Sequence, residues 1–226
     1  MDDVFLQFAM RYAGKGISVV PNYAVSETGK CSCSEPECGY PGKHSRLEKG
    51  IHPDQVRRQG SKNMTQIKAW WNEWPNSNIA VCTGKESNIV VVDIDPRNNG
   101  FNSLSFLESK FGKFMTLSVK SGGNGQHLYF KHPKDGTVRT RVGLLPGIDI
   151  KGENGRIVAP PSRHGSGGMY GFMNDFETTY LQPLPMGLLN MIQVQKGTGT
   201  WQAMQQKPIE RTKKTYFQMK KLLGGK

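Results

Sequence analysis

A strongly apolar run over residues 89–92 leads directly into Asp93, and Asp95 follows two positions later. Because side chains alternate along a strand, an extended chain points both carboxylates to the same face. Two adjacent carboxylates repel each other, and burying them is costly unless a cation compensates their charge. Carboxylate oxygens are the ligands that Mg and Mn prefer, so this pair is a candidate site for a divalent metal ion. The alternative is a solvated strand end that carries two surface aspartates.

A glycine-rich loop precedes a second candidate, His127. The loop reads Ser121-Gly122-Gly123-Asn124-Gly125. Consecutive glycines allow backbone amides to approach a phosphate closely, and His127 at the start of the next strand could donate to the same anion. We therefore expect phosphate contacts from Ser121, Gly122 and Gly123 as well as from His127. The alternative is a hairpin turn followed by a half-buried histidine.

The third candidate is Asp149, which lies in an apolar, strand-like stretch as Asp93 does. Lys151 follows on the same strand face, because it stands two positions later. A carboxylate beside a lysine could serve one metal ion and one phosphate. The alternative is a buried ion pair of Asp149 with Lys151 or with Arg156.

A rigid turn is expected further along the chain, because Pro160-Pro161 excludes a central strand there. This turn would present Ser162 and His164. Together with Arg156, these two residues are weaker candidates for contact with a nucleotide or a template.

The elements that must position these residues follow from hydrophobic periodicity and from the placement of Gly and Pro. Helices are predicted over 4–13, 65–74, 103–111 and 186–195, the second with Thr65 as its N-cap. Strands are predicted over 17–20 (stopped by Pro21), 78–83, 88–95, 116–121, 126–131, 147–151, 156–160 and 170–172. The two strands that flank the glycine loop should form a hairpin, and 147–151 should pair with 156–160. This mixture predicts an α+β or α/β domain over about 1–195.

Three of the four cysteines, Cys31, Cys33 and Cys38, lie within eight residues, and His44 follows them. They belong to a polar segment, residues 22–63, that is too long for an ordinary structureless loop, so something other than a core must organise it. A cytosolic chain keeps its thiols reduced, which argues against a disulfide. The fourth cysteine lies in a strand-like run and is expected in the core.

Of the 226 residues, 30 are Lys or Arg and 18 are Asp or Glu, which gives a formal net charge of +12. A basic chain favours polyanionic partners, chiefly nucleic acid or an anionic membrane surface. No apolar stretch approaches the roughly 18 residues that a transmembrane helix needs, and the N-terminus lacks the basic and apolar regions of a secretory signal. We therefore expect a cytoplasmic protein without a membrane partner. Strong apolar runs and an aromatic content of 9% exclude a disordered chain.

The excess charge is concentrated in residues 196–226, which hold 8 basic residues and 1 acidic residue. We interpret this segment as a basic linker or tail, or as the start of a helical accessory domain, with a basic amphipathic helix over 209–223. The candidate DNA contacts are Lys213, Lys214, Lys220 and Lys221, with Trp201, Tyr216 and Phe217 as candidates for base stacking. The alternative is a solvated extension that contacts nothing.

Taken in order, the segments VVVDIDP, SGGNGQHLYF and GIDIKGENGRIVAPPSRHGSGGMY resemble the three motifs of the bifunctional primase–polymerase (prim-pol) family, which belongs to the archaeo-eukaryotic primase superfamily. The resemblance covers roughly residues 5–190 and includes the segments AMRYAGKGISVVP and IKAWWNEWPNSNIAVCTG. One departure is Gly125, which stands where some members carry a serine. A phosphate contact by that hydroxyl is then lost or moved to Ser121.

The resemblance implies an α+β fold, the archaeo-eukaryotic primase catalytic core with an RRM-like subdomain. It also implies a DNA primase and DNA polymerase that makes and extends primers on single-stranded DNA from NTPs or dNTPs. Such domains occur in replication proteins of plasmids, phages and other mobile elements, and a replicative helicase in the same chain or operon is the expected partner. The alternative is a non-catalytic module of a replication initiator that binds nucleotide or single-stranded DNA. A metal-dependent nuclease or glycosyltransferase would not explain the glycine loop and the Pro-Pro-Ser segment together.

The family's pattern also assigns roles to individual residues. The catalytic residues would be Asp93, Asp95, His127 and Asp149. The three aspartates would hold two Mg or Mn ions for an in-line transfer. His127, Lys151 and the backbone of residues 121–123 would neutralise the phosphates.

The cysteine cluster is similar to a pattern found in some members of the family, CxCx4CxxPGKH. Cys31, Cys33, Cys38 and His44 would bind one structural zinc ion tetrahedrally, with His52 as the alternative fourth ligand. Such a site would organise a small zinc-binding insertion, over about residues 22–50, that has no core of its own.

Overall fold

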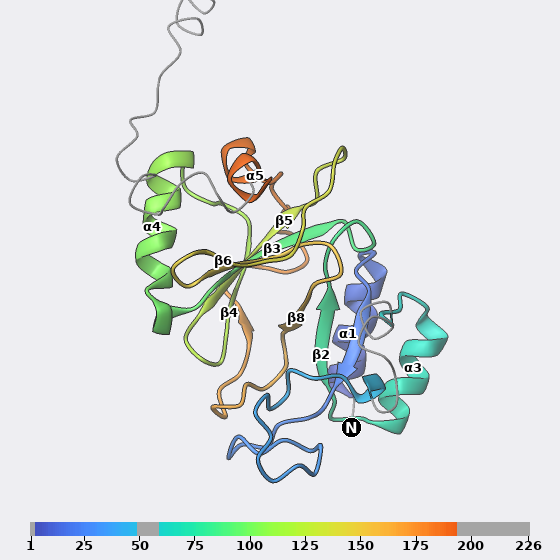
Figure 1. The fold of residues 1–226 in the computed structure, drawn as a ribbon. Coiled ribbons are helices and arrows are strands. Elements are labelled where there is room, and N and C mark those ends of the chain that lie inside the picture. Colours follow the sequence, from blue (N-terminus) through green and yellow to red (C-terminus); the bar gives the residue numbers. More distant parts are fainter. Residues whose placement is uncertain (1–2, 49–58, 194–226) are drawn as a thin grey trace, which may run out of the picture. The chain divides into compact units, whose positions relative to one another are not determined.

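The structure is a computed structural model that describes residues 3–48 and 59–193 (Figure 1). The predictions for His52, for Lys213, Lys214, Lys220 and Lys221, and for the rest of residues 196–226 lie outside the described residues. The described part contains four α-helices and two antiparallel β-sheets, which makes the fold α+β. Within it, no helix is long and apolar enough to cross a membrane.

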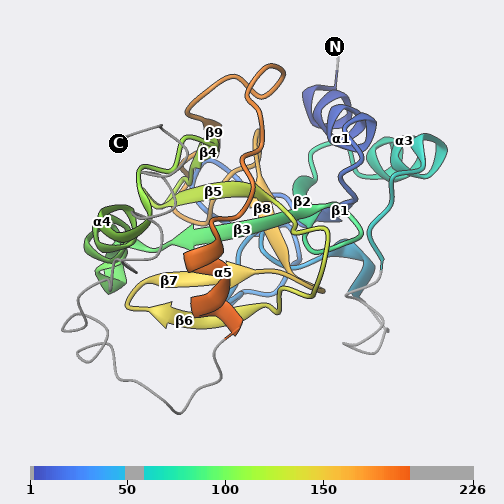
Figure 2. The same cartoon turned by 90° about the horizontal axis from the view of Figure 1, so that it is seen from above.

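The larger sheet has six strands in the order β6-β7-β3-β5-β4-β9 (Figure 2). The smaller sheet has three strands in the order β1-β2-β8. The strands in chain order are β1 (Val19–Asn22), β2 (Asn78–Cys82), β3 (Ile89–Ile94), β4 (Leu117–Lys120), β5 (Gln126–Lys131), β6 (Arg141–Leu145), β7 (Ile148–Lys151), β8 (Arg156–Ala159) and β9 (Gly171–Phe172). β3 lies inside the larger sheet, so both of its neighbours can bring side chains to it.

The helices cover different parts of this frame. They are α1 (Val4–Gly14), α3 (Met64–Glu73), α4 (Gly100–Phe111) and α5 (Met186–Gln193), with two short 3₁₀ turns, η1 (Arg46–Glu48) and η2 (Pro96–Asn98). α1 packs against α3 and the smaller sheet, whereas α4 packs against β3, β7 and α5. Figure 1 accordingly shows α1 and α3 on the right and α4 and α5 at the upper left.

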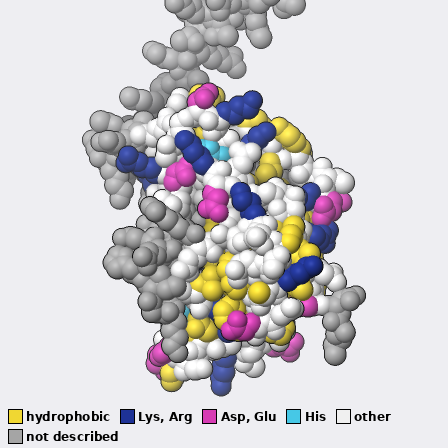
Figure 3. All heavy atoms as spheres, turned by 90° about the vertical axis from the view of Figure 1, so that its right-hand side faces the viewer, with side chains coloured by type: hydrophobic (Ala, Val, Ile, Leu, Met, Phe, Trp, Pro, Cys, Tyr) yellow, Lys and Arg dark blue, Asp and Glu magenta, His cyan; other side chains and the backbone are white. Residues whose placement is uncertain are grey.

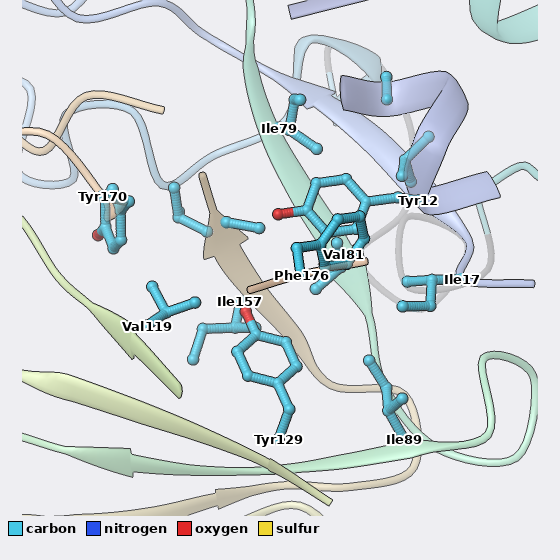
Figure 4. Close-up of a cluster of buried hydrophobic side chains, with 14 of the residues drawn as sticks. Tyr12, Ile17, Ile79, Val81, Ile89, Val119, Tyr129, Ile157, Tyr170 and Phe176 are labelled. Carbon is cyan, nitrogen blue, oxygen red and sulfur yellow. The ribbon is translucent and has the colours of Figure 1, made fainter. Parts of the chain in front are cut away.

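The main core fills the space between the two sheets (Figure 4). Val91 of β3 joins this core together with Tyr129 of β5 and Ile157 of β8. Val90 and Val92 point to the opposite face and are also fully buried. β3 is therefore buried on both faces, which explains why its sequence is a continuous apolar run instead of an alternating one.

The face of the molecule that carries α1 and α3 mixes side chains of several kinds (Figure 3). Phe5, Phe8 and Trp70 of these helices are partly buried and pack against the core. Basic and acidic side chains both lie on this face, so it is not a continuous basic surface.

The predicted end of the first strand is wrong. The strand was expected to stop before Pro21, but β1 runs through Pro21 to Asn22, which pairs with Asn78 of β2. β1 is an edge strand of its sheet, where a residue without a backbone N–H is tolerated.

The four predicted helices are present, with one difference in capping. The side chain of Asn63, and not that of Thr65, caps α3: Asn63 Oδ1 accepts the backbone N–H groups of Thr65 at 2.9 Å and Gln66 at 3.1 Å. Asparagine is among the strongest N-cap residues, and it stands two positions earlier than the predicted cap.

The predicted pairing of 147–151 with 156–160 is also wrong. Both strands exist, but β7 pairs with β3 and β6 in the larger sheet, whereas β8 pairs with β2 in the smaller one. The actual partner of β7 on its outer side, β6, was not predicted at all. Its residues Val142 and Gly143 are exposed while Leu144 and Leu145 are buried, so no regular alternation marks it as a strand.

Candidate active site

The register of the larger sheet places three of the predicted site residues in one row. Asp93 of β3 lies directly opposite His127 of β5 on one side and directly opposite Asp149 of β7 on the other. Directly opposed residues of neighbouring strands share a face of the sheet. This face is the one on which Val91 and Tyr129 join the core between the sheets, so the row continues the core toward the end of β3.

Lys151 lies between the two carboxylates of this row. Its Nζ atom is 2.9 Å from Asp149 Oδ2 and 3.6 Å from Asp93 Oδ2. The other oxygen of Asp149 accepts the backbone N–H of Gly143 at 2.8 Å. The ion pair of Asp149 with Lys151, considered above as an alternative, is therefore present, and it shows that the two carboxylates can share one cation.

His127 is buried at the other end of the row, with 4% of its surface exposed. Its Nε2 atom is 3.6 Å from Asp93 Oδ1, which is too long for a direct hydrogen bond. Its Nδ1 atom is buried and has no hydrogen-bond partner among the described residues. Burial lowers the pKa of His127 to about 4, although the charge of Asp93 acts in the opposite direction. At neutral pH the imidazole is thus uncharged and contributes hydrogen bonding, not positive charge, before a ligand binds.

Asp95 lies just beyond β3 and starts the turn η2. Its backbone N–H donates to Gly147 O at 2.8 Å, which extends the pairing of β3 with β7 by one bond. Its carboxylate is held by the guanidinium of Arg97, with Nε 3.0 Å from Oδ1 and Nη2 2.9 Å from Oδ2, and by the amide of Asn98. Hydrogen bonds from Arg97 lower the pKa of Asp95. Because the Arg97 side chain is 76% exposed, solvent weakens this ion pair, and the carboxylate remains accessible to a metal ion.

The glycine loop offers two free backbone donors beside the row. The backbone N–H groups of Gly122 and Gly123 have no acceptor among the residues that the structure describes. Ser121 closes the turn, because its Oγ atom accepts the backbone N–H of Gly125 at 2.9 Å. A Cβ atom at Gly125 would lie 2.5 Å from the carbonyl oxygen of Ile94, so a serine at this position would not fit without a shift.

A second loop, residues 162–168, holds the glycine loop in place. Ser166 Oγ donates to the carbonyl oxygen of Gly122 at 2.8 Å. His164 lies against the same loop, since a Cβ atom at Gly123 would be 3.0 Å from its Cε1 atom. The ring of Tyr170 lies 5.6 Å from that of His127 and 5.9 Å from that of His164, so one buried tyrosine packs against both histidines.

Two of the weaker candidates have other partners. Ser162 is fully buried, and its hydroxyl accepts the backbone N–H of Ile79 at 2.8 Å and lies 3.3 Å from the Ile79 carbonyl oxygen. It thereby continues the pairing of β8 with β2. Arg156 pairs in register with Cys82, where β2 leads into β3, and so lies toward the opposite end of β3 from Asp93. Neither placement supports a contact with nucleotide.

Two basic residues near the row, Arg97 and Lys43, were not predicted. Arg97 stands two positions after Asp95, and this spacing is the signal in the sequence that indicates their contact. Lys43 precedes His44 in the cysteine segment, and the charges of Asp93 and Asp95 act on it although burial lowers the pKa of its ammonium group. Its position depends on how the cysteine segment folds, which no local pattern reveals.

Cys31, Cys33, Cys38 and His44 form a compact group, and their ligand atoms all lie within 4.8 Å of one another. The Nε2 atom of His44 is 3.3 Å from Cys31 Sγ and 3.5 Å from Cys38 Sγ. Tetrahedral zinc with ordinary Zn–S and Zn–N lengths places its ligand atoms about 3.4–3.8 Å apart, so the group could bind zinc. It is the one such convergent group in the described part of the chain, since Asp93 and Asp149 lie in the row whereas Asp95 lies beyond β3 and pairs with Arg97.

Burial raises the pKa of the Cys38 thiol to about 11, and the neighbouring thiols of Cys33 and Cys31 add to the rise. Three sulfur atoms this close cannot all carry negative charge unless a cation compensates them. The chemistry of the donor set therefore fits a zinc ion.

An antiparallel α+β frame that carries a row of carboxylates beside free backbone donors is suited to the binding and transfer of phosphoryl groups. A comparison with family models agrees: the model of the bifunctional DNA primase/polymerase N-terminal domain (Prim-Pol) matches residues 9–186, and the chain belongs to this family. The predicted family resemblance is thus confirmed. A comparison with curated proteins finds no match. The family is one of primase and polymerase enzymes, which implies DNA and nucleotides as substrates and divalent metal ions as cofactors.

Proposed function

We propose that this protein is a template-dependent nucleotidyltransferase, a DNA primase and DNA polymerase that makes and extends primers on single-stranded DNA. The observation that carries the proposal is the row formed by Asp149, Asp93 and His127 across three neighbouring strands. Family membership supports the reaction class. The row supports a site in which carboxylates and a neutral imidazole lie beside each other.

The three aspartates are the proposed ligands of two Mg or Mn ions. Lys151 already lies within 4 Å of both Asp93 and Asp149, so this part of the row accommodates a cation. When bound, the ions would neutralise the triphosphate and lower the pKa of the attacking 3′-hydroxyl. Asp95 would join them by turning from Arg97, an exposed partner.

The remaining groups of the site are proposed to bind the triphosphate. The free backbone N–H groups of Gly122 and Gly123 can donate to phosphate oxygens, as consecutive glycine amides do in other phosphate sites. The uncharged His127 can donate one further hydrogen bond. Lys151 would keep its positive charge beside the phosphates once it leaves Asp149.

The cysteine segment is proposed to be a structural zinc site, and the larger sheet with its helices is proposed to be the RRM-like subdomain of the family. A domain boundary near residue 195 stays a prediction, as do a helicase partner and a role in the replication of a mobile element, plasmid or phage. These proposals rest on the sequence resemblance.

The test is primer synthesis on a single-stranded DNA template with Mg or Mn, comparing NTPs with dNTPs. We expect products from the wild-type protein and none above background from the double variant Asp93→Ala with Asp95→Ala. Asp135→Asn is the matched control, because Asp135 is exposed and lies outside the row, and it should retain full activity. Full activity of the double variant would refute the assignment. DNA binding without any incorporation by the wild type would favour the non-catalytic replication module.

A further inference from the structure

The cysteine segment lies directly against the loop that supports the glycine loop. A Cβ atom at Gly165 would be 3.2 Å from Pro41 Cβ, and one at Gly42 would be 3.3 Å from Arg163 O. A Cβ atom at Gly29 would lie 2.3 Å from Gly165 O. The two segments thus approach backbone to backbone, as Figure 1 shows beneath the smaller sheet.

The position of this contact is set by Gly42. Its carbonyl oxygen accepts a hydrogen bond from Asn22 Nδ2 at 3.0 Å. Its φ angle is +71°, and a Cβ atom there would lie 2.5 Å from Asn78 Nδ2, so only glycine fits. Two residues later, His44 enters the cysteine group. Lys43 is therefore held between a fixed backbone anchor and a candidate zinc ligand.

Lys43 carries a positive charge near the row that no described carboxylate pairs with. Lys151 is paired with Asp149 and Arg97 is paired with Asp95. Lys43 makes no ion pair or side-chain hydrogen bond with any other described residue, and the residue is exposed to solvent although its ammonium group is partly covered. Lys43 follows Gly42, where a Cβ atom would lie 3.3 Å from Arg163 O, and the next residue of that loop, His164, lies against Gly123. The charges of Asp93 and Asp95 also act on the ammonium group of Lys43.

We infer that Lys43 binds the polyphosphate of the incoming nucleotide, and that metal binding by Cys31, Cys33, Cys38 and His44 holds it in position for this contact. The inference rests on the proposed function and adds a residue to it. We infer a polyphosphate as the ligand because the aspartates near Lys43 are the proposed ligands of the metal ions that a nucleoside triphosphate binds. The cysteine group then acts on the active site as a positioning device through the chain link from His44 to Lys43.

The experiment measures equilibrium binding of two probes, dATP with Mn²⁺ and inorganic tripolyphosphate with Mn²⁺, by calorimetry. We expect Lys43→Gln to weaken both probes by about tenfold or more, as the loss of a hydrogen bond to a charged group does. Lys43→Arg should retain most of the affinity. Lys30→Gln is the matched control, since Lys30 is an exposed lysine of the same segment, and it should bind both probes within about twofold of the wild type.

The positioning role is tested with Cys38→Ser. We expect this variant to lose its zinc in elemental analysis and to bind both probes as weakly as Lys43→Gln does. The double variant should show no further loss, because the two changes remove the same contact. Lys43→Gln itself should keep its zinc.

Several results would overturn the inference. These are an unchanged affinity of Lys43→Gln for tripolyphosphate, an unchanged affinity for dATP, or a loss of zinc from Lys43→Gln. Additive losses in the double variant would overturn the positioning role. A wild-type protein that binds neither probe would refute the proposed function as well, whereas a wild type that binds and synthesises primers while Lys43→Gln binds equally well would refute the inference alone.

Discussion

Two buried tyrosines of the core, Tyr12 and Tyr129, differ in what their hydroxyl groups contact (Figure 4). The Tyr12 hydroxyl donates to Pro160 O at 3.0 Å, whereas the Tyr129 hydroxyl has no partner among the described residues. We expect Tyr12→Phe to lower the free energy of unfolding by about 1 kcal/mol, because it removes a donor from a buried carbonyl. Tyr129→Phe should leave that free energy unchanged or raise it slightly. Urea unfolding of the two variants compares them directly, and equal losses would contradict the assignment.

A second prediction for a single residue concerns Lys151 and its effect on metal binding. Its ammonium group occupies the space between Asp93 and Asp149 that a metal ion would share. Lys151→Met should therefore bind Mn²⁺ more tightly in the absence of nucleotide, by about tenfold, since a competing charge is gone. The same variant should incorporate nucleotide more slowly, because the phosphates lose a cation. Electron paramagnetic resonance of free Mn²⁺ measures the first effect, and an unchanged Mn²⁺ affinity would speak against a shared site.

For single residues, the sequence predicted which side chains belong to the candidate site and which face of a strand they share. Alternation correctly predicted that Lys151 shares a face with Asp149, and the structure brings Asp93, Asp149 and His127 together. The sequence could not predict the charge state of His127, because the pKa of its imidazole depends on burial by residues distant in the sequence. Lys43 was missed for the same reason.

Among the elements, the glycine loop makes the sharpest prediction. A Cβ atom at Gly122 would lie 2.3 Å from Gly168 O and 2.6 Å from His164 Cβ, so one of the two loops must move. We expect Gly122→Ala to lower the free energy of unfolding by about 1–3 kcal/mol and to weaken tripolyphosphate binding. Gly171→Ala is the control, since a Cβ atom at Gly171 would meet nothing within 4 Å. If thermal unfolding and binding show the two variants to be equivalent, the close approach of the loops is not required.

The cysteine segment predicts a chelator effect. Treatment with a zinc chelator should expose three thiols to alkylation, and the intact protein should contain about one zinc per chain by elemental analysis. Cys82 is the internal control, because it is buried and burial raises the pKa of its thiol to about 11. Mass spectrometry of alkylated peptides should therefore find Cys82 unmodified under both conditions. Less than about half an equivalent of zinc would contradict the site.

The elements also show where periodicity stops being informative. Apolar residues at alternate positions located β7 and an apolar run located β8, but neither pattern identifies the strand with which each one pairs. The chain passes from the larger sheet to the smaller one between β7 and β8, so the predicted hairpin of these two strands is wrong. β6 was missed because its exposed Val142 and Gly143 break the alternation.

For the whole molecule, the net charge of +12 and its concentration in residues 196–226 make a prediction about salt. Each phosphate that a cation neutralises on a single strand contributes about 0.7 to the slope of log K against log salt. Replacing Lys213, Lys214, Lys220 and Lys221 with Gln should reduce that slope by up to about 3 for single-stranded DNA. Primer extension at saturating template should be unaffected. Fluorescence anisotropy at several salt concentrations measures the slope, and an unchanged slope would favour a tail that contacts nothing.

The composition and the motifs were enough to expect an α+β domain of this family, because the motifs are short and contiguous. The division into two sheets was not expected, since it depends on pairings such as β2 with β8 that join distant parts of the chain.

Those distant pairings bear on when the protein can become active during synthesis. β3 acquires its neighbour β5 only after residue 131 and its neighbour β7 only after residue 151. The smaller sheet is complete only once β8, which ends at Ala159, has been synthesised. The loop of residues 162–168, which supports the glycine loop, follows after that. A nascent chain therefore contains Asp93 and Asp95 long before it contains the third carboxylate or a closed core. The row of Asp149, Asp93 and His127 needs β3, β5 and β7 together, so it cannot form before residue 151 has been synthesised.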